Sequence, residues 1–366
     1  MKKGRQIAVI AVFVCILAGF AASHILLPDQ ELSKAERRKL AALPELTKEG
    51  VLSKTYMEDM EGYLMDQFPL REELRASKAF ITLALLRQKD VHQIYPFEGG
   101  LYKWEPQLKP REIEYFVDKI NDISLKYLKN NQVYYSIIPD KDYYIAEKSG
   151  RPYLDYDRLF AMVNENVTEA QYIDIIGALN ETAYYKTDTH WKQTSLQPVY
   201  RRLGMGMGFF PSLESWHNHA LRSEYPFYGV YRGQSAILTD GERLEYMTND
   251  ATKNAVVTSA EVSGTLPVYN VENFDGLDGY DLFLNGPQAV MTIENRQADT
   301  DRELILFRDS FGSSLAPLLI DTYAKITLID LRYIAADYLP QFVDFAEQDV
   351  LFIYSASLIN GAMVLK

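Results

Sequence analysis

The run Leu304-Ile-Leu-Phe-Arg-Asp-Ser-Phe-Gly312 predicts a strand of the fold and the turn that follows it. Its first four residues are apolar, which is typical of a strand buried on both faces of a parallel sheet. Ser310 follows where the apolar run ends, and Gly312 permits a tight turn there. A nucleophile exposed by such a turn, after a strand and before a helix, suits acyl-transfer chemistry. Ser310 is therefore the candidate nucleophile, and a helix N-cap is its alternative role.

Four further apolar runs have the length and composition of buried strands. They are residues 133–138, 172–176, 326–329 and 350–354. Helical stretches separate these runs, and one of them begins at Pro110 and repeats its apolar residues at helical spacing. Strands that alternate with helices predict an α/β fold with a doubly wound parallel sheet. Binding sites in such sheets lie beyond the carboxyl ends of the strands, where Lys141, Ser310 and Arg332 occur.

A second stretch, Tyr184-Tyr-Lys-Thr-Asp-Thr-His-Trp191, brings an acid and an imidazole within two residues of each other. Successive side chains of an extended segment alternate in direction, so Asp188 and His190 are expected on one side. A carboxylate that orients a histidine, which in turn activates a serine, makes a Ser-His-Asp triad. We therefore predict that Ser310, His190 and Asp188 form such a triad. The alternative is a surface loop with an incidental histidine.

The composition argues against several classes of function. The formal charge of −12 disfavours nucleic-acid binding, which requires a basic face. Cys15 is the single cysteine, so neither a disulfide framework nor a zinc–thiolate site is expected. His217 and His219 are spaced like ligands on a strand, but two histidines without a third ligand make a weak metal site. We expect neither a cofactor nor a metal.

The amino terminus has the pattern of a membrane anchor. Basic residues occur at positions 2, 3 and 5, and residues 7–27 carry no charge over a length that spans a bilayer as a helix. Asp29 and Glu31 follow, so the positive-inside rule places the rest of the chain outside the cytoplasm. We predict a transmembrane anchor over residues 1–27. Cleavage as a signal peptide, which would release a secreted protein, is the alternative.

The rest of the chain is expected to form two parts. Residues 28–90 are predicted to form a stalk and a helical segment, with a short capped helix at 33–44. Residues 91–366 are predicted to form the catalytic domain. Within that domain, residues 206–300 are rich in Gly, Thr, Asn and Tyr and contain short alternating runs, which predict a mainly β insertion.

Six short motifs along the chain resemble those of a known family. They are Asp66-Gln-Phe-Pro-Leu-Arg71, Ile138-Pro-Asp-Lys141, Tyr185-Lys-Thr-Asp-Thr-His-Trp191, Phe227-Tyr-Gly-Val-Tyr231, Arg308-Asp-Ser-Phe-Gly312 and Asp330-Leu-Arg-Tyr333. In these motifs the chain resembles the DHHW proteins of Gram-positive bacteria and, more distantly, the SGNH-hydrolase-like domains of alginate O-acetyltransferases. Thr189 stands where the DHHW name implies a histidine, which is the form that the acetyltransferases show.

The resemblance implies a fold and an activity. The fold would be an SGNH-hydrolase-like, flavodoxin-like sheet, with the triad at Ser310, His190 and Asp188. The activity would be that of an extracytoplasmic O-acetyltransferase that passes an acyl group through an acyl-serine to a cell-surface or exopolysaccharide glycan. If water accepts the acyl group instead, the enzyme is an esterase. The resemblance also implies a multi-pass membrane O-acyltransferase as the partner that supplies acetyl groups.

Five further residues are candidate contacts to the glycan. They are Arg308, Lys141, Trp191, Tyr231 and Arg332. Packing is the alternative role for the tryptophan, and ion pairing is the alternative for the three cations. Two other classes of function stay open at this point. One is a non-catalytic glycan-binding or envelope-assembly protein with the same fold, and the other is a metal-dependent enzyme that uses His217 and His219.

Overall fold

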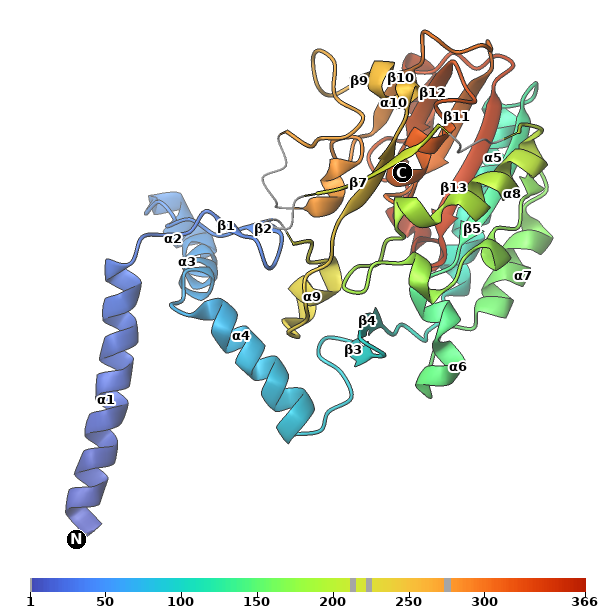
Figure 1. Cartoon of the computed structure of the whole chain (residues 1–366). Helices are drawn as coiled ribbons and strands as arrows, with labels where there is room; N and C mark the ends of the chain where they lie inside the picture. Colours follow the sequence, from blue (N-terminus) through green and yellow to red (C-terminus); the bar gives the residue numbers. More distant parts are fainter. Residues whose placement is uncertain (1, 211–214, 222–225, 273–277) are drawn as a thin grey trace. The chain divides into compact units, whose positions relative to one another are not determined.

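The computed structural model describes residues 2–210, 215–221, 226–272 and 278–366, and the chain forms two compact units (Figure 1). The first unit contains Met1–His92 together with the short segment Arg232–Leu238. The second unit contains Gln93–Tyr231 and Thr239–Lys366, and it holds all three predicted triad residues.

A seven-stranded sheet forms the centre of the second unit, with the strand order β6-β5-β13-β11-β12-β10-β9. Its strands are β5 (Gln132–Ile138), β6 (Gln171–Tyr172), β9 (Val256–Ser259), β10 (Val290–Glu294), β11 (Glu303–Arg308), β12 (Lys325–Ile329) and β13 (Asp349–Ser355). The first five strands in the spatial order are parallel, and β10 and β9 run antiparallel to their neighbours. The predicted α/β fold with a mainly parallel sheet is confirmed.

Helices cover both faces of this sheet. The longer ones are α5 (Pro110–Tyr127) and α7 (Tyr156–Asn166) on one face and α8 (Gln197–Met207) on the other. In β11, Leu304 and Leu306 pack into the core with α8, whereas Ile305 and Phe307 pack into the core with α5 and α7. Alternate residues of a strand face opposite ways, so burial on both sides explains the continuous apolar run.

The predicted insertion at 206–300 takes part in the sheet. Its strands β9 and β10 form the antiparallel edge, with Met291 of β10 opposite Leu328 of β12. Two further strands, β7 (His217–Ala220) and β8 (Glu245–Thr248), form a separate ribbon. The remaining elements of this unit are β3 (Ile94–Phe97), β4 (Gly100–Lys103), α6 (Ala146–Ser149), α10 (Asp250–Asn254), α11 (Gly312–Leu315) and α12 (Ala356–Ile359).

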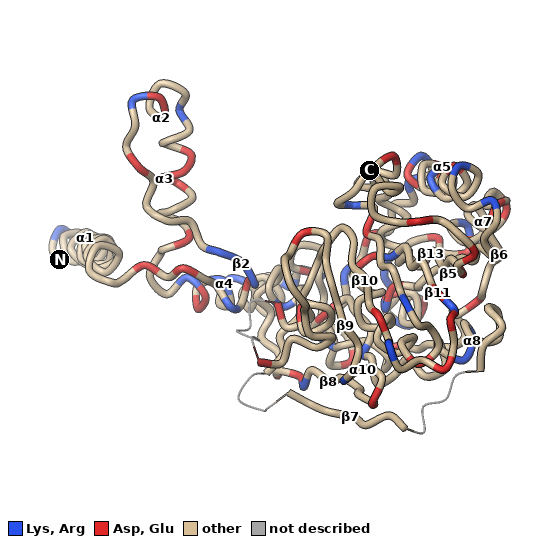
Figure 2. Tube along the Cα trace, turned by 90° about the horizontal axis from the view of Figure 1, so that it is seen from above, with Lys and Arg blue, Asp and Glu red and all other residues tan. Residues whose placement is uncertain are grey.

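The first unit is helical apart from one small ribbon. Its elements are α1 (Lys2–Leu26), β1 (Leu32–Ser33), β2 (Arg38–Lys39), α2 (Lys48–Ser53), α3 (Thr55–Asp66), α4 (Arg71–Phe80) and a π-helical turn (Ile81–Leu85), and α9 (Val230–Ser235) contributes its later residues. Among the described residues, α1 is the one helix that is long and apolar enough to cross a membrane. Figure 2 shows its basic residues gathered at the amino end.

The helix predicted at 33–44 is wrong, because the structure has the β1–β2 ribbon there. Arg37 adopts the left-handed conformation, with φ 59°, and this closes the turn between the two strands. The Arg38 guanidinium donates to both carboxylate oxygens of Asp66, with Nη1 2.7 Å from Oδ2. These contacts to α3 outweigh the local helix propensity, which is a weak preference that tertiary contacts override.

Candidate active site

The two predicted halves of the triad meet in the second unit. The Nε2 atom of His190 lies 2.7 Å from the Ser310 hydroxyl oxygen, and its Nδ1 atom lies 2.6 Å from Oδ1 of Asp188. Asp188 is fully buried and His190 nearly so, whereas Ser310 is half-buried. Both distances are within hydrogen-bonding range, so the carboxylate orients the imidazole and the imidazole faces the hydroxyl.

The serine lies on a turn that Asp309 holds at the end of the sheet. β11 ends at Arg308, and the next residue, Asp309, accepts hydrogen bonds from the Phe311 N–H through Oδ1 and from the Ser355 N–H and hydroxyl through Oδ2. Asp309 therefore ties the turn to the end of the neighbouring strand β13. Gly312 is required here because a Cβ atom would lie 2.5 Å from the Cβ atom of Arg308.

Acyl transfer needs a donor for the oxyanion that forms at the attacked carbonyl, and we predict that the backbone N–H of Ser310 is this donor. The adjacent Phe311 N–H donates to Asp309 at 3.0 Å, so it is engaged within the turn. The helix α11 that follows has only four residues and continues as a 3-10 turn, so its dipole is small. The Ser310 N–H remains the predicted donor.

The loop that carries the acid and the histidine is held by a buried lysine. The Nζ atom of Lys141 donates to the carbonyl oxygens of Tyr185, Lys186 and Asp188 at 2.7, 3.0 and 3.1 Å. Lys141 follows the carboxyl end of β5, which places its ammonium group inside the loop. Burial lowers the pKa of Lys141 to about 7, while the three carbonyl oxygens use all three of its hydrogens.

Acidic groups flank this lysine. Burial raises the pKa of Asp140 to about 6 and the pKa of Asp142 to about 7. Asp140 accepts from the Ser357 N–H, and Asp142 accepts from the Tyr95 hydroxyl. The support of the loop therefore contains ionisable groups whose charge changes near neutral pH.

A second set of long-range contacts secures the same loop from residues 227–242. The carboxylate of Glu242 accepts from the N–H groups of Lys186 and Thr187 at 2.8 and 2.9 Å. The Val230 N–H donates to Oδ2 of Asp188 at 2.7 Å, so both oxygens of this carboxylate are bonded. Gly229 packs so closely on the loop that a Cβ atom would overlap Asp188 and the carbonyl oxygen of Thr187.

Tyr280 completes the surroundings of the histidine. Its ring stacks on His190 with 3.8 Å between the ring centroids and 12° between the planes. Its hydroxyl lies 2.7 Å from the Ser314 hydroxyl, four residues beyond the candidate nucleophile. The stacking restrains rotation of the imidazole. Sequence reasoning missed this residue, because it is one of 26 tyrosines and no motif marks it.

The predicted glycan contacts at Lys141, Trp191 and Tyr231 need correction. All three side chains are buried. Lys141 bonds the loop carbonyls, and Trp191 Nε1 donates to the Phe311 carbonyl and the Ser314 hydroxyl. Tyr231 lies against Lys141, with Nζ 5.4 Å from its ring centroid. Polar groups that are bonded inside the protein do not face a substrate, so we reassign these residues to positioning the loop and the turn.

The two predicted arginine contacts lie in a network around Asp330. Arg308 is buried, with Nη1 3.6 Å from Oδ2 of Asp330, and its burial excludes direct contact with a glycan. Arg332 donates to both oxygens of Asp330, with Nε 2.9 Å from Oδ1. Arg332 is only partly buried, so its contact with a glycan stays a prediction.

The two histidines considered for metal binding lie on strand β7, away from the triad in the sequence and exposed. His219 Nε2 lies 2.7 Å from the Thr248 hydroxyl, and its ring stacks near Tyr246. In the part of the chain that the structure describes, no group of three or more His, Cys, Asp and Glu side chains is placed to hold a metal ion.

Comparison with known proteins gives matches among solved structures. No protein-family model and no curated sequence matches the chain. Bacillus cereus PatB1 matches with a TM-score of 0.61 and 20% identity, over 74% of this chain and 98% of PatB1, and a PatB1 structure with a sulfonyl adduct matches with a TM-score of 0.59. A DHHW family protein from Eubacterium siraeum matches with a TM-score of 0.60 and 16% identity, over 74% and 92% of the two chains.

The O-acetyltransferase domain of Pseudomonas putida AlgJ matches with 11% identity over 75% of this chain and 93% of that domain. Its TM-score of 0.43 is too low to support an argument about the fold. The TM-scores for PatB1 and the DHHW family protein, 0.61 and 0.60, are high enough to assign the fold. The chain therefore has the fold of these two proteins, and the resemblance predicted from its motifs is confirmed at the level of the fold.

Proposed function

We propose that this protein is an O-acetyltransferase that modifies a glycan outside the cytoplasm through an acyl-serine at Ser310. The observation that supports it most directly is the continuous chain of hydrogen bonds from Asp188 through His190 to the Ser310 hydroxyl. A serine alcohol is a weak nucleophile until a base takes its proton, and this arrangement supplies the base and its orienting group.

The proposed cycle has two half-reactions. In the first, Nε2 of His190 takes the proton of Ser310 while Oγ attacks the carbonyl carbon of the acetyl donor. The tetrahedral intermediate collapses to acyl-serine, and His190 returns the proton to the leaving group. In the second, a sugar hydroxyl gives its proton to His190 and attacks the acyl-serine, which releases the O-acetylated sugar and restores Ser310. Water as the acceptor would make the same site an esterase.

We also propose that α1 anchors the protein in the cytoplasmic membrane, with both units outside the cytoplasm. Its uncharged length and the basic residues before it support this orientation. An anchored enzyme can take acetyl groups from a multi-pass membrane O-acyltransferase, which is the partner that the resemblance implies.

The test uses the full chain with p-nitrophenyl acetate as the acetyl donor. We expect Ser310→Ala and His190→Ala each to lower the rate of nitrophenol release by about 10³-fold or more. His219→Ala and Ser357→Ala are matched controls, since these residues lie outside the triad, and they should retain the wild-type rate.

A second readout tests the nucleophile without turnover. Sulfonyl fluorides react with activated serines, and one PatB1 structure carries a sulfonyl adduct. Phenylmethanesulfonyl fluoride should add one sulfonyl group to the wild-type peptide that contains Ser310 and none to Ser310→Ala. A folded wild-type protein that shows neither turnover nor labelling would favour the non-catalytic glycan-binding role instead.

A further inference from the structure

An open apolar groove runs along helices α3 and α4 of the first unit. Its apolar lining comes from Met57, Met60, Leu64, Met65, Phe68 and Leu74, and its volume is about 760 Å³. Met57 and Met65 are 66% and 60% exposed. Soluble proteins rarely leave contiguous apolar surface of this kind uncovered, so the groove indicates a contact surface.

The exposed apolar residues repeat at helical spacing. On α3, Met57 and Leu64 share one face of the helix, and Phe68 follows two residues after the helix ends. The stripe continues on α4 and the π-helical turn after it, where Leu74, Ile81 and Leu85 are exposed at intervals of seven and four residues. Such a stripe beside charged residues is the pattern of an amphipathic helix that lies on an apolar surface.

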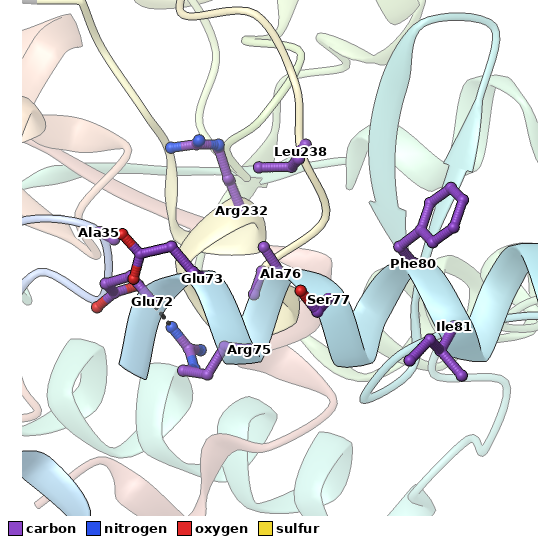
Figure 3. Close-up of a pocket in the computed structure, with 11 residues that line it drawn as sticks. Ala35, Glu72, Glu73, Arg75, Ala76, Ser77, Phe80, Ile81, Arg232 and Leu238 are labelled. Atoms are coloured by element: carbon purple, nitrogen blue, oxygen red, sulfur yellow. Dashed lines mark hydrogen bonds and ion pairs between the residues drawn. The ribbon is translucent and has the colours of Figure 1, made fainter. Parts of the chain in front are cut away.

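A second groove lies on α4 beside residues 232–238, which belong to the first unit. This second groove has a volume of about 690 Å³ and includes Phe80, Ile81 and Leu238. Figure 3 shows Glu72 and Arg75 toward one end of the lining and Phe80 and Ile81 toward the other. Apolar surface therefore extends along α4 toward its carboxyl end.

Contacts with α1 place the start of this stripe at the depth of the membrane. The rings of Phe20 and Phe68 stack with 5.1 Å between their centroids, and Nδ1 of His24 lies 3.1 Å from the Gln67 carbonyl oxygen. Phe20 is seven residues before Leu27, the outer end of the uncharged segment, which is about 10 Å along a helix. Phe68 therefore lies beside the part of α1 that would occupy the outer leaflet.

We propose that α3 and α4, with the π-helical turn, form a second membrane-binding element in which the apolar stripe contacts lipid acyl chains beside α1. This inference rests on the proposed anchoring by α1. A depth of 5–10 Å below the headgroups is usual for interfacial helices, which agrees with the position of Phe68. Residues 48–89 contain seven basic and seven acidic side chains, so apolar burial rather than attraction to anionic lipid drives the contact.

The experiment places single fluorescent probes on the full chain in phosphatidylcholine nanodiscs that hold one copy each. Native Cys15 reports on α1, because it lies within the uncharged segment. In a Cys15→Ser background, Met65→Cys and Leu74→Cys report on the groove. The controls are Asp59→Cys, which lies on the opposite face of α3, and Phe342→Cys, an exposed apolar position of the second unit. Quenching by nitroxide-labelled lipids is measured for each labelled protein.

We expect quenching of the Met65 and Leu74 probes by lipids labelled near the headgroup to be several-fold greater than that of the two control probes. Adding anionic lipid to the nanodiscs should not increase the quenching of the groove probes. If the Cys15 probe is quenched by deeply labelled lipid while the groove probes are not, α1 spans the membrane and the second element does not exist. Groove probes that are shielded from water but not quenched would show that protein covers the stripe, which also overturns the proposal. If no probe is quenched, the anchor itself is wrong.

Discussion

The two halves of the candidate triad are held in place in different ways. The turn at Ser310 is held by its own strand and by Asp309, which reaches the end of the adjacent strand β13. The loop with Asp188 and His190 has little regular structure, and residues more than 40 positions away hold it through Lys141, Glu242 and Val230. The candidate nucleophile thus lies on a turn at the end of a paired strand, with one side-chain anchor on β13, whereas the candidate base lies on a loop that several separate segments hold. Substitutions should separate the two.

The largest effect is expected for Lys141→Met. Methionine fills similar space but leaves the carbonyls of Tyr185, Lys186 and Asp188 without their buried donor. We expect the free energy of unfolding to fall by about 3 kcal/mol or more, since each buried unpaired carbonyl costs about 1–3 kcal/mol. Chemical denaturation measures it, and the exposed Lys148→Met is the control. A change no larger than that of the control would mean that the loop does not need the lysine.

Gly229→Ala should act on the base more than on overall stability. The new methyl group overlaps Asp188, so the loop must move. We expect esterase kcat/KM to fall by about 10²-fold, because small displacements of a catalytic group are costly, and the free energy of unfolding to fall by about 1–3 kcal/mol.

The matched control is Gly177→Ala, where a Cβ atom meets nothing within 4 Å. Sulfonyl labelling of Ser310 separates the two halves of the triad further. Labelling should slow in Gly229→Ala because the base is displaced, while the serine turn itself stays folded. Wild-type kinetics in this variant would contradict the close packing of Gly229 on Asp188.

The stability of the region that supports the His190 loop should also depend on pH. Burial raises the pKa of Asp142 to about 7, above its ordinary value of 3.8. The folded protein therefore loses stability as the pH rises from about 4 to 7, because the unfolded chain releases this proton more readily than the folded protein does. Asp142→Asn removes this cost. The variant should therefore gain stability over wild type as the pH rises from 5 to 8. We expect the gain in unfolding free energy to be about 1–2 kcal/mol larger at pH 8 than at pH 5, and the melting temperatures of both proteins at the two pH values measure it. Exposed Asp157→Asn should show no such difference.

The smallest effect is expected on the serine side, for Ser355→Ala. Asp309 loses one hydrogen bond from the Ser355 hydroxyl but keeps those from the N–H groups of Ser355 and Phe311. The free energy of unfolding should fall by about 1 kcal/mol, with kcat/KM nearly unchanged. A loss of activity as large as that of Gly229→Ala would show that the serine turn depends on its single side-chain anchor as much as the His190 loop depends on its several contacts.

Local patterns in the sequence predicted the elements that local interactions form. The apolar run before Ser310, the helix after Pro110 and the pairing of Asp188 with His190 all follow from spacing within a few residues. The contacts that hold the loop of Asp188 and His190 in place do not follow from such spacing. Lys141 follows a predicted strand, which suggested a contact to the glycan or an ion pair, and only the fold shows that the loop at 185–188 closes over it.

Long-range contacts also explain the errors elsewhere. The stretch 33–44 has the composition of a capped helix, but Arg38 pairs with Asp66 in α3 and the stretch becomes a ribbon. Gly229 belongs to one of the motifs on which the family resemblance rests. The sequence did not show why a glycine is needed there, which is that Asp188 packs against it. Tyr280 had no signal in the sequence at all.

The path of the chain between the two units has a consequence for release from the cell surface. The chain passes from one unit to the other at three points, after His92, Tyr231 and Leu238. After a single proteolytic cut at His92, residues 1–92 are still held to the rest of the chain by their non-covalent contacts with residues 232–238. A fragment that begins at Gln93 keeps residues 232–238 but loses their partners, including Arg75, whose guanidinium donates to the Gly233 carbonyl. Shedding by one protease, and expression of the second unit alone, are therefore both disfavoured by the topology of the chain.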